Sequence, residues 1–495
     1  MSVARIAVLG AGIAGLAIAL SAGRNGHEVV LVERDDTPMP ADAHEAFDWN
    51  RRGAPQVRHS HAFLARLRNL LRDRHPDVLA ALYDAGATPM DFVAMLPEGM
   101  DRTPMPGDED LIAIACRRTT FEWVLRHTVL DEGSAMLLHG VAVEELRVVA
   151  GPDGAPPTVT GVVLSDGATV EADLVIAAGG RRNDLPGLLR AQGVEVPETI
   201  EDTGIVYFSR FFRLLDGAEH PPQSGPIGGD LGYLKFGVFM GDNRTFSVTL
   251  AARTDDTELR RQLLDPEEFL RVAAQIPGTA AHVESRRSEP ITEVSVMAGL
   301  LNRRREFVDE HGNPIVLGLH AVGDAHTCTN PLYGRGCSLA VVQAELFSDA
   351  LELHGLDHDA RARAFEATTA TEIAPWYRAA VAQDRMNRRA ARADAEAAAL
   401  ADGDAPSPID GDSTSVDPRD VARELMRDGL LPAMRVDPVV LRAFLRMFNL
   451  LEAPDSLMSD ADVIGRVMTV FQQRGERPPE TPAGPNRAEL MATLA

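Results

Sequence analysis

Three glycines near the N-terminus have the spacing of a phosphate-binding turn. They belong to the segment GAGIAG (residues 10–15), which follows an apolar run at residues 5–9 and begins a helical pattern. Gly10 permits a tight turn, Gly12 lets the backbone approach a pyrophosphate, and Gly15 lets the helix pack close to the preceding strand. The helix would present free N–H groups and the positive end of its dipole to the phosphate. The segment therefore predicts a dinucleotide site.

A carboxylate stands at the end of the next predicted strand. Residues 27–33 read HEVVLVE, and Glu33 follows Gly15 by 18 residues. At that place a carboxylate can accept the hydrogens of both adenosine ribose hydroxyls and would repel a 2′-phosphate. The pattern favours FAD or NAD over NADP at this site, and Arg34 is expected beside it.

A second glycine-rich helix start lies far downstream. Residues 314–322 form an apolar strand pattern that is followed by Gly323 and Asp324. The segment NPLYGRGCS (residues 330–338) then precedes a run with apolar residues at helical spacing. The amino end of such a helix suits an anionic group, such as the N1/O2 edge of a reduced flavin.

Together with an arginine-led helix pattern at residues 118–125, these motifs resemble FAD-dependent monooxygenases of the para-hydroxybenzoate hydroxylase-like superfamily. The resemblance covers residues 1–350. The segment GAPQ (residues 53–56), with His59 and His61, looks like a stretch found in the bacterial olefin epoxidases and hydroxylases of that superfamily. The resemblance implies FAD as the cofactor and NAD(P)H as the reductant.

The resemblance also assigns roles to single residues. It implies that Asp324 hydrogen-bonds the ribityl chain, that Arg118 lies near the ribityl or pyrophosphate, and that the backbone of Val143, in a strand pattern at residues 137–146, contacts adenine. His61 either lines the flavin pocket or serves capping and solvent contact. The expected cofactor-binding residues are Gly10, Gly12, Ile13, Ala14, Gly15, Glu33, Arg34, Arg118, Val143, Asp324, Pro331, Gly334, Gly336 and Cys337.

One departure from the family pattern concerns the reductant. Where the family has an Asp-Gly pair, this chain has Gly179 and Gly180, followed by Arg181, Arg182 and Asn183. The strand and its turn are retained, but the way in which NAD(P)H docks is left open.

These motifs predict an α/β fold with a Rossmann-type FAD-binding domain, an inserted β-sheet substrate domain and a C-terminal helical extension. The expected bounds are residues 1–75, 101–182 and 298–350 for the FAD-binding domain, residues 76–100 and 183–297 for the substrate domain, and residues 351–495 for the helical region. A Gly/Ser/Pro/Asp-rich linker is expected near residues 402–417, and a Pro-rich tail at residues 477–485 is expected to end the fold.

Aromatic residues concentrate in the predicted substrate domain. Residues 203–246 hold 8 of the chain's 25 aromatic residues (3 Trp, 5 Tyr and 17 Phe), in strand-like stretches. Sheet packing explains such residues as well as a second hypothesis, in which the sheet forms the floor of an apolar substrate pocket. The candidates for that pocket are His61, Tyr207, Phe211, Tyr233 and Phe236.

Composition argues against several classes of protein. The 495-residue chain has a formal net charge of −24, which opposes binding to nucleic acid or to anionic membranes. Glycines interrupt the apolar run at residues 6–23, so neither a signal peptide nor a membrane anchor is expected. The three cysteines lack the spacing of a disulfide framework or a zinc site, which favours a cytoplasmic location and no metal.

The leading hypothesis is a monooxygenase in which a flavin C4a-hydroperoxide inserts one atom of molecular oxygen into a small apolar substrate, by olefin epoxidation or aromatic hydroxylation. No catalytic side chain is assigned, because the flavin would carry the chemistry. Two alternatives stay open: a flavin-dependent reductase or dehydrogenase of the geranylgeranyl reductase kind, and a non-catalytic flavin-binding partner.

Overall fold

A five-stranded parallel sheet forms around the N-terminal strand β1 (Arg5–Leu9). Its strand order is β18-β9-β1-β2-β5, and every neighbouring pair is parallel. The other strands are β2 (Glu28–Glu33), β5 (Met136–His139), β9 (Leu174–Ala177) and β18 (Leu319–Ala321). Apolar strands of this kind form where both faces of a sheet are covered. The sheet confirms the predicted Rossmann-type core.

The computed structural model describes residues 2–221, 228–401, 424–477 and 482–494. The linker expected near residues 402–417 lies outside the described residues.

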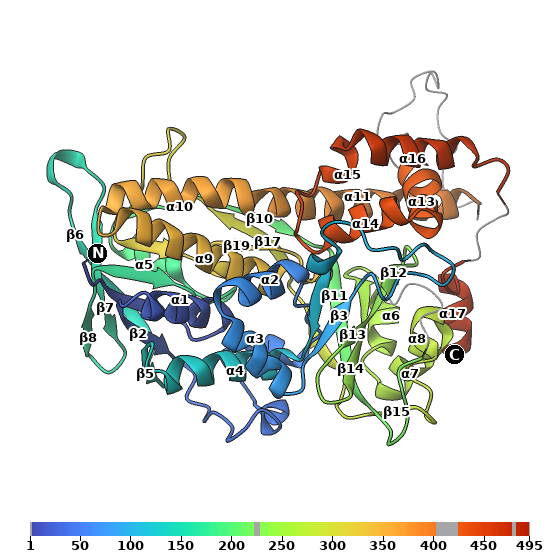
Figure 1. The fold of residues 1–495 in the computed structure, drawn as a ribbon, viewed down its shortest axis with the longest axis horizontal. Helices are drawn as coiled ribbons and strands as arrows, with labels where there is room; N and C mark the ends of the chain where they lie inside the picture. Colours follow the sequence, from blue (N-terminus) through green and yellow to red (C-terminus); the bar gives the residue numbers. More distant parts are fainter. Residues whose placement is uncertain (1, 222–227, 402–423, 478–481, 495) are drawn as a thin grey trace.

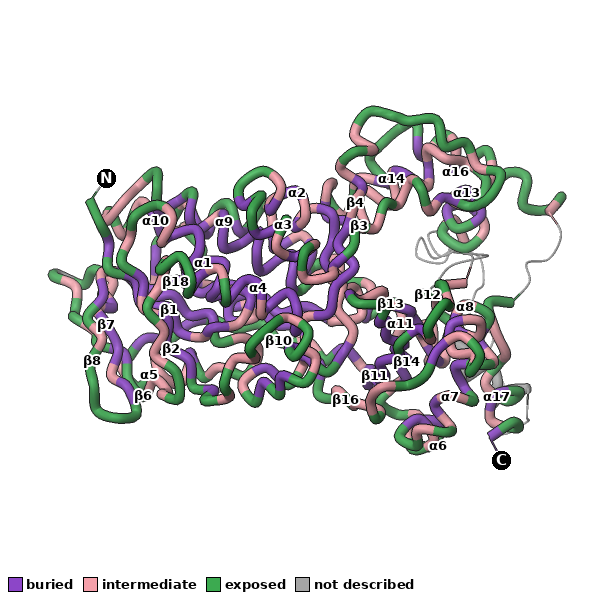
Figure 2. Tube along the Cα trace, turned by 60° about the horizontal axis from the view of Figure 1, so that its bottom comes forward, coloured by how far each residue is buried: buried purple, intermediate pink, exposed green. Residues whose placement is uncertain are grey.

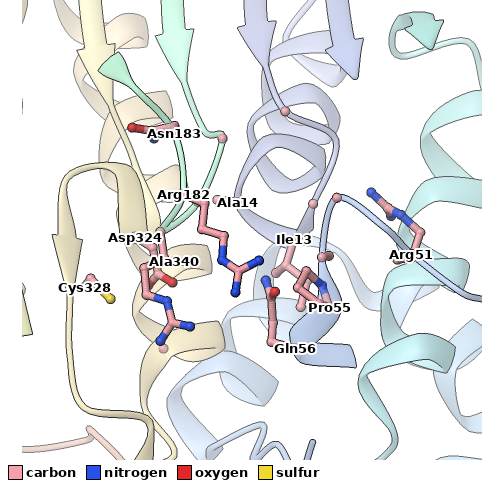
Figure 3. Close-up of a pocket in the computed structure, with 18 of the residues that line it drawn as sticks. Ile13, Ala14, Arg51, Pro55, Gln56, Arg182, Asn183, Asp324, Cys328 and Ala340 are labelled. Atoms are coloured by element: carbon pink, nitrogen blue, oxygen red, sulfur yellow. The ribbon is translucent and has the colours of Figure 1, made fainter. Parts of the chain in front are cut away.

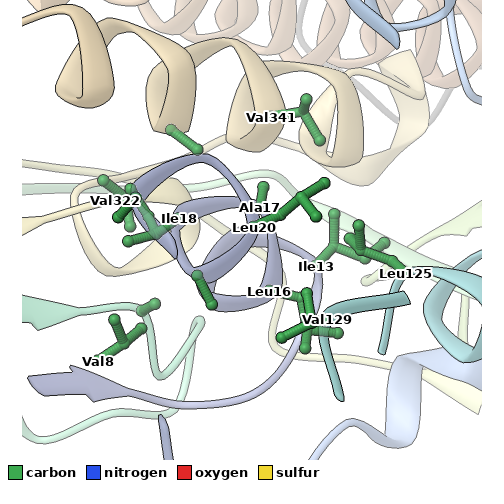
Figure 4. Close-up of a cluster of buried hydrophobic side chains, with 14 of the residues drawn as sticks. Val8, Ile13, Leu16, Ala17, Ile18, Leu20, Leu125, Val129, Val322 and Val341 are labelled. Atoms are coloured by element: carbon green, nitrogen blue, oxygen red, sulfur yellow. The ribbon is translucent and has the colours of Figure 1, made fainter. Parts of the chain in front are cut away.

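Side chains of β1 alternate between two hydrophobic cores. Ile6 and Val8 belong to a core shared with several helices, and Ala7 and Leu9 belong to the core on the opposite face. These helices include α1 (Ile13–Arg24), α4 (Arg118–Asp131) and α9 (Gly336–His354). The opposite face is covered by α5 (Leu185–Ala191), β6 (Val143–Val149), β7 (Thr158–Leu164) and β8 (Thr169–Glu171). Figure 4 shows α1 packed between Val341 of α9 and Val129 of α4.

Two predicted strands are wrong in extent. The pattern at residues 137–146 is two strands, β5 and β6, because Gly140 between them has a positive φ of 75° and reverses the chain. The pattern at residues 314–322 contributes only the short strand β18, and Gly318 before it also has a positive φ, of 72°. In both cases an apolar run continues across a glycine at which the backbone turns.

A second sheet, antiparallel throughout, contains the aromatic stretch. Its order is β12-β13-β14-β11-β15, with β16 also pairing with β11. The strands are β11 (Ile205–Leu214), β12 (Gly228–Asp230), β13 (Leu234–Met240), β14 (Thr245–Arg253), β15 (Ser288–Pro290) and β16 (Ser295–Met297). Its helices are α6 (Thr257–Gln262), α7 (Pro266–Gln275) and α8 (Pro277–Ala280).

The Pro-rich segment at residues 477–485 does not end the fold. A final helix, α17 (Arg487–Leu494), follows it, and Leu490 and Leu494 are buried in the core of the second sheet. Figure 1 shows this helix beside α7 and α8. In the sequence it is distant from the other residues of that core. The end of the chain therefore stabilises the inserted sheet.

Other helices and a small sheet connect the two large sheets. The connecting sheet contains β10 (Glu198–Asp202), β17 (Leu301–Arg305) and β19 (Thr327–Cys328). Figure 1 shows α10 and α11 crossing the top of the molecule from the first sheet to the second. The helical elements are α2 (Ala65–Arg74), α3 (Pro76–Asp84), α10 (His358–Glu372), α11 (Ala374–Ala401), α13 (Leu431–Val436), α14 (Pro438–Phe448), α15 (Ser456–Ser459) and α16 (Ala461–Gln472).

Burial follows this arrangement. Figure 2 shows buried chain in the helices and strands around α1 and α4 and in β11 and β14, with exposed chain in the peripheral loops. None of the described helices combines the length and the apolar character that crossing a bilayer requires.

The packing of α1 on the first turn makes a testable prediction. A Cβ atom added at Gly15 would overlap the carbonyl oxygen of Gly10, whereas one added at Gly465, in α16, would meet no atom within 4 Å. We expect Gly15→Ala to lower the free energy of unfolding by about 1–3 kcal/mol. Gly465→Ala should leave it unchanged or raise it by about 0.5–1 kcal/mol. Urea unfolding followed by circular dichroism measures both, and equal effects would contradict the proposed close packing.

Candidate cofactor site

A cavity of about 850 Å³ lies at the carboxyl ends of β1, β2 and β9. This edge of a parallel sheet is where ligands of doubly wound folds bind. All the predicted cofactor-binding residues except Gly15 line the cavity, and Gly15 packs behind it against Gly10. The predicted residues that line the cavity are Gly10, Gly12, Ile13, Ala14, Glu33, Arg34, Arg118, Val143, Asp324, Pro331, Gly334, Gly336 and Cys337. Figure 3 shows Asp324 and Ala340 at the left of this view and Arg51 at the right, with Ile13 and Pro55 between them.

The amino end of α1 fits a pyrophosphate. Gly12 is the N-cap, no side chain caps the helix, and its first turn carries no acidic residue. Gly10 has a positive φ of 113°, and a Cβ there would lie 2.8 Å from the carbonyl oxygen of Ala178. The free N–H groups and the helix dipole therefore face a space in which an anion is favoured and side chains are excluded.

Glu33 is more heavily engaged than the sequence indicated. One carboxylate oxygen, Oε2, accepts hydrogen bonds from the backbone N–H of Ala11 (3.0 Å) and from Arg51 (3.1 Å), and Oε1 accepts one from the backbone N–H of Asp35 (3.0 Å). A carboxylate oxygen has about two lone pairs, so only Oε1 keeps one free. Glu33 can then accept a hydrogen from one ribose hydroxyl, where the sequence had predicted two.

Arg51, which the sequence analysis did not single out, fixes this end of the cavity. Its side chain is 2% exposed and is ion-paired with three carboxylates, those of Glu33, Asp35 and Glu122. The guanidinium also lies 4.9 Å from the ring centroid of Trp49. Breaking any one of these buried ion pairs would leave an uncompensated charge, which is energetically costly. The carboxylate of Glu33 is therefore held in one orientation. Its members are too distant in sequence for a local pattern to connect them.

The amino end of α9, which also lines the cavity, fits the pyrimidine edge of a flavin. Gly334, with a positive φ of 65°, turns the chain into α9, whose N-cap Arg335 provides no side-chain cap. Gly336 has no atom within 4 Å of its added Cβ position. Burial raises the pKa of the Cys337 thiol and that of the Asp324 carboxyl, although Arg181 and Arg118 oppose the latter shift. The amino end of α9 can thus stabilise a negative charge in the cavity.

His61 lies in the cavity wall as a neutral side chain. Its Nδ1–H donates to the carbonyl oxygen of His59 (2.9 Å), and its Nε2 faces Nη1 of Arg118 at 3.4 Å. Burial and the neighbouring Arg118 hold the pKa of His61 well below its ordinary value. Among the described residues, no group of three His, Cys, Asp or Glu side chains could hold a metal ion.

The four aromatic candidates for the substrate pocket do not line the cavity. Phe236 lies in the core of the second sheet, and the hydroxyl of Tyr233 donates to the carbonyl oxygen of Pro485 (3.0 Å). Phe211 contacts Phe47, with ring centroids 6.1 Å apart, and Tyr207 packs behind Met297. Their side chains serve the sheet packing that was the alternative explanation for this stretch.

A segment with little sequence signal lines the cavity instead. Residues 293–298, which include β16, contribute the apolar side chains of Val294, Val296 and Met297 and the polar side chains of Glu293 and Ser295. The loop after β9 contributes Arg181 and Arg182. Residues 293–298 carry no motif, and pairing of β16 with β11 brings them to the cavity, whereas the loop after β9 had been singled out in the sequence for Gly179 and Gly180.

The C-terminal helices hold the loop that precedes α9. Asp384 of α11 is 3% exposed and accepts hydrogen bonds from Asn302 (2.6 Å), Asn330 (2.9 Å) and the hydroxyl of Tyr333 (2.7 Å). Near it, the guanidinium of Arg335 lies 5.1 Å from the ring centroid of Tyr333 and is also stacked on α11. The helical extension is therefore part of the scaffold of the site.

A second contact of the same kind lies beside the histidines. Asn449, which ends α14, accepts a hydrogen bond on its side-chain oxygen from the backbone N–H of Ala65 (3.0 Å). Its carbonyl oxygen accepts another from the N–H of Arg66 (3.2 Å). Asn449 thus caps α2, whose first turn follows His61 closely in the chain.

Comparisons with known proteins agree with this geometry. Residues 5–80 match the protein family described as FAD dependent oxidoreductase. No curated protein sequence matches the chain.

Solved structures share the fold at low sequence identity. One is pqsL, a probable FAD-dependent monooxygenase from Pseudomonas aeruginosa (16% identity, TM-score 0.54, 78% of this chain and 95% of that chain). Another is OxyS anhydrotetracycline hydroxylase from Streptomyces rimosus (18% identity, TM-score 0.54, 91% and 77%). A third is CmlS, a flavin-dependent halogenase (17% identity, TM-score 0.53, 100% and 77%). The family match and the shared fold confirm the resemblance that the motifs predicted: the chain has the FAD-dependent oxidoreductase fold.

The Asp384 contacts make a prediction about cofactor binding. We expect Asp384→Asn to lower the free energy of unfolding by about 1–3 kcal/mol, because an amide in place of the carboxylate leaves buried donors unmatched. The loop before α9 should loosen and FAD occupancy should fall. Thermal unfolding and flavin absorbance after gel filtration measure the two effects. Asp359→Asn, which changes an exposed carboxylate of α10, should alter neither.

A second prediction concerns pH. Burial, with Arg181 and Arg58 nearby, lowers the pKa of His59 to about 4, from an ordinary value of about 6.5. The unfolded chain therefore takes up a proton at His59 that the folded chain does not, and stability is lost as the pH falls from about 6.5 to about 4. His59→Asn should remove up to about 3 kcal/mol of that loss. Urea unfolding at several pH values tests this against His311→Asn, an exposed control that should follow the wild-type profile.

Proposed function

We propose that this chain is an FAD-dependent monooxygenase that uses NAD(P)H and molecular oxygen to insert one oxygen atom into a small apolar substrate. The observation that carries the proposal is that one cavity is lined by the uncapped amino ends of two helices, α1 and α9, and also by Glu33. FAD has two groups that the amino end of a helix would stabilise, its pyrophosphate and the pyrimidine edge of its flavin ring.

The residues of the chain have defined tasks in this proposal. The amino end of α1 and Glu33 bind the adenosine and pyrophosphate half, and Asp324 and Arg118 bind near the ribityl chain. FAD, when bound, would supply the redox chemistry, which is the acceptance of a hydride from NAD(P)H and the activation of oxygen. The amino end of α9 holds the negative charge of the reduced ring, and the neutral His61 orients Arg118 without adding charge.

The wall formed by residues 293–298 supports an apolar substrate. Val294, Val296 and Met297 face the cavity, and such a surface excludes water from the reacting atoms. Epoxidation of an olefin and hydroxylation of an aromatic ring both suit this wall. The net charge of −24 supports the proposal that the protein does not bind nucleic acid. The three free cysteines support a cytoplasmic location.

The proposal predicts that the purified protein binds FAD and consumes NAD(P)H and oxygen in the presence of a substrate. Mass spectrometry of small apolar compounds incubated with the enzyme should then show the gain of one oxygen atom. Asp324→Ala should weaken FAD binding by about tenfold, since it removes a hydrogen bond to the cofactor. Asp216→Ala, at an exposed position in the turn that follows β11, is the matched control.

Two outcomes would contradict the proposal. A wild-type protein that stays free of FAD after reconstitution would remove its basis. A product that gains two hydrogen atoms and no oxygen would identify a reductase of the geranylgeranyl reductase kind instead.

A further inference from the structure

A small side pocket opens from the main cavity. Its volume is about 190 Å³, and four of its residues, Arg181, Arg182, Ala298 and Cys328, also line the main cavity. No carboxylate lines it. The complete lining is Arg181, Arg182, Ala298, Gly299, Leu301, Arg303 and Cys328.

Two of the three arginines come from the loop after β9. The chain leaves that strand through Gly179 and Gly180, where Gly180 has a positive φ of 68°, and this turn carries Arg181 and Arg182 to the pocket. Within the described parts of the chain, neither guanidinium has a hydrogen bond or an ion pair. Figure 3 shows Arg182 extending into the main cavity.

The third arginine is held rigidly. Arg303 of β17 is 9% exposed, and its Nη2 donates to the carbonyl oxygens of Arg181 (3.0 Å) and Asp324 (3.0 Å). Its Nε has no hydrogen-bond partner, and the carboxylate of Glu198, 3.5 Å away, already accepts from Arg305 at 2.7 Å. A buried N–H without a hydrogen-bond partner is unfavourable, so the guanidinium of Arg303, which lines the pocket, is not fully satisfied by the protein.

Three cations around so small a pocket repel one another, and an anion between them removes that cost. Two carboxylates lie near these arginines, since Glu198 is 3.5 Å from Nε of Arg303 and Asp324 lines the main cavity, but neither lines the side pocket. The chain as a whole is acidic, so a local cluster of three guanidinium groups does not follow from composition. Guanidinium groups match the planar oxygens of carboxylates and phosphates.

We infer that the side pocket lined by Arg181, Arg182 and Arg303 binds an anionic group, a carboxylate or a phosphate, of a ligand that enters the main cavity. The nicotinamide dinucleotide or the substrate could carry this group, and this assignment of the source rests on the proposed function. The loop that carries Arg181 and Arg182 has no acidic residue from Ala178 to Asn183, so these two positive charges are not balanced within it.

The experiment compares three proteins loaded with FAD: the wild type, the double variant Arg181→Gln/Arg182→Gln, and the control Arg190→Gln. Arg190 is an exposed residue of α5 that lines neither cavity. Isothermal titration at fixed ionic strength measures binding of inorganic pyrophosphate, NADP⁺, benzoate and its uncharged counterpart benzamide. None of these titrations needs turnover.

We expect the double variant to bind pyrophosphate at least about tenfold more weakly than the wild type. An equal loss for NADP⁺ with unchanged benzoate binding assigns the pocket to the dinucleotide. A loss for benzoate with unchanged benzamide and NADP⁺ binding assigns it to a substrate carboxylate. Either result supports the anion site.

Unchanged binding of all the anions in the double variant would overturn the inference, as would an equal loss in Arg190→Gln. A wild type that holds FAD and binds these anions but never oxygenates a substrate would refute the proposed function alone. Failure of the inference and failure of the proposed function are thereby distinguished.

Discussion

The close approach of α1 to the first strand is the constraint on which the site depends. Because Gly15 has no side chain, the helix packs directly against the carbonyl of Gly10, and its amino end points into the space beyond the sheet. The same approach places Glu33, at the end of the adjacent parallel strand, within hydrogen-bond distance of the backbone N–H of Ala11. The turn, the helix dipole and the Glu33 carboxylate are thus one unit, and a side chain at either glycine would disturb all three.

Charge is distributed inside the cavity in a different way from the charge of the whole chain. Around Glu33, Arg51 is ion-paired with three buried carboxylates, and one of these, Glu122, also pairs with Arg118, so this part of the cavity is held rigidly. Around Cys337, the amino end of α9 and Arg118 contribute positive charge.

The sequence could predict those parts of the site in which the chemistry is local. The two glycine-rich turns and the acid after β2 each lie within a few residues of the strand or helix that positions them, so their spacing determines their geometry. Arg51 and residues 293–298 could not be predicted, because their positions depend on pairing between distant segments. The two strands assigned too long show the opposite error: apolar periodicity continues through Gly140 and Gly318, although the backbone turns there.

The C-terminal helices contribute hydrogen bonds to the segments that surround the cavity. Composition indicated helices and nothing more, yet Asp384 and Asn449 each reach the chain beside the cavity, one at the loop before α9 and the other at the first turn of α2. Both side chains satisfy buried polar groups that the N-terminal domain leaves open at its own helix ends and loops. A flavin-binding core without these helices would therefore contain unmatched donors next to its cofactor site, so the extension and the core must fold as one structure.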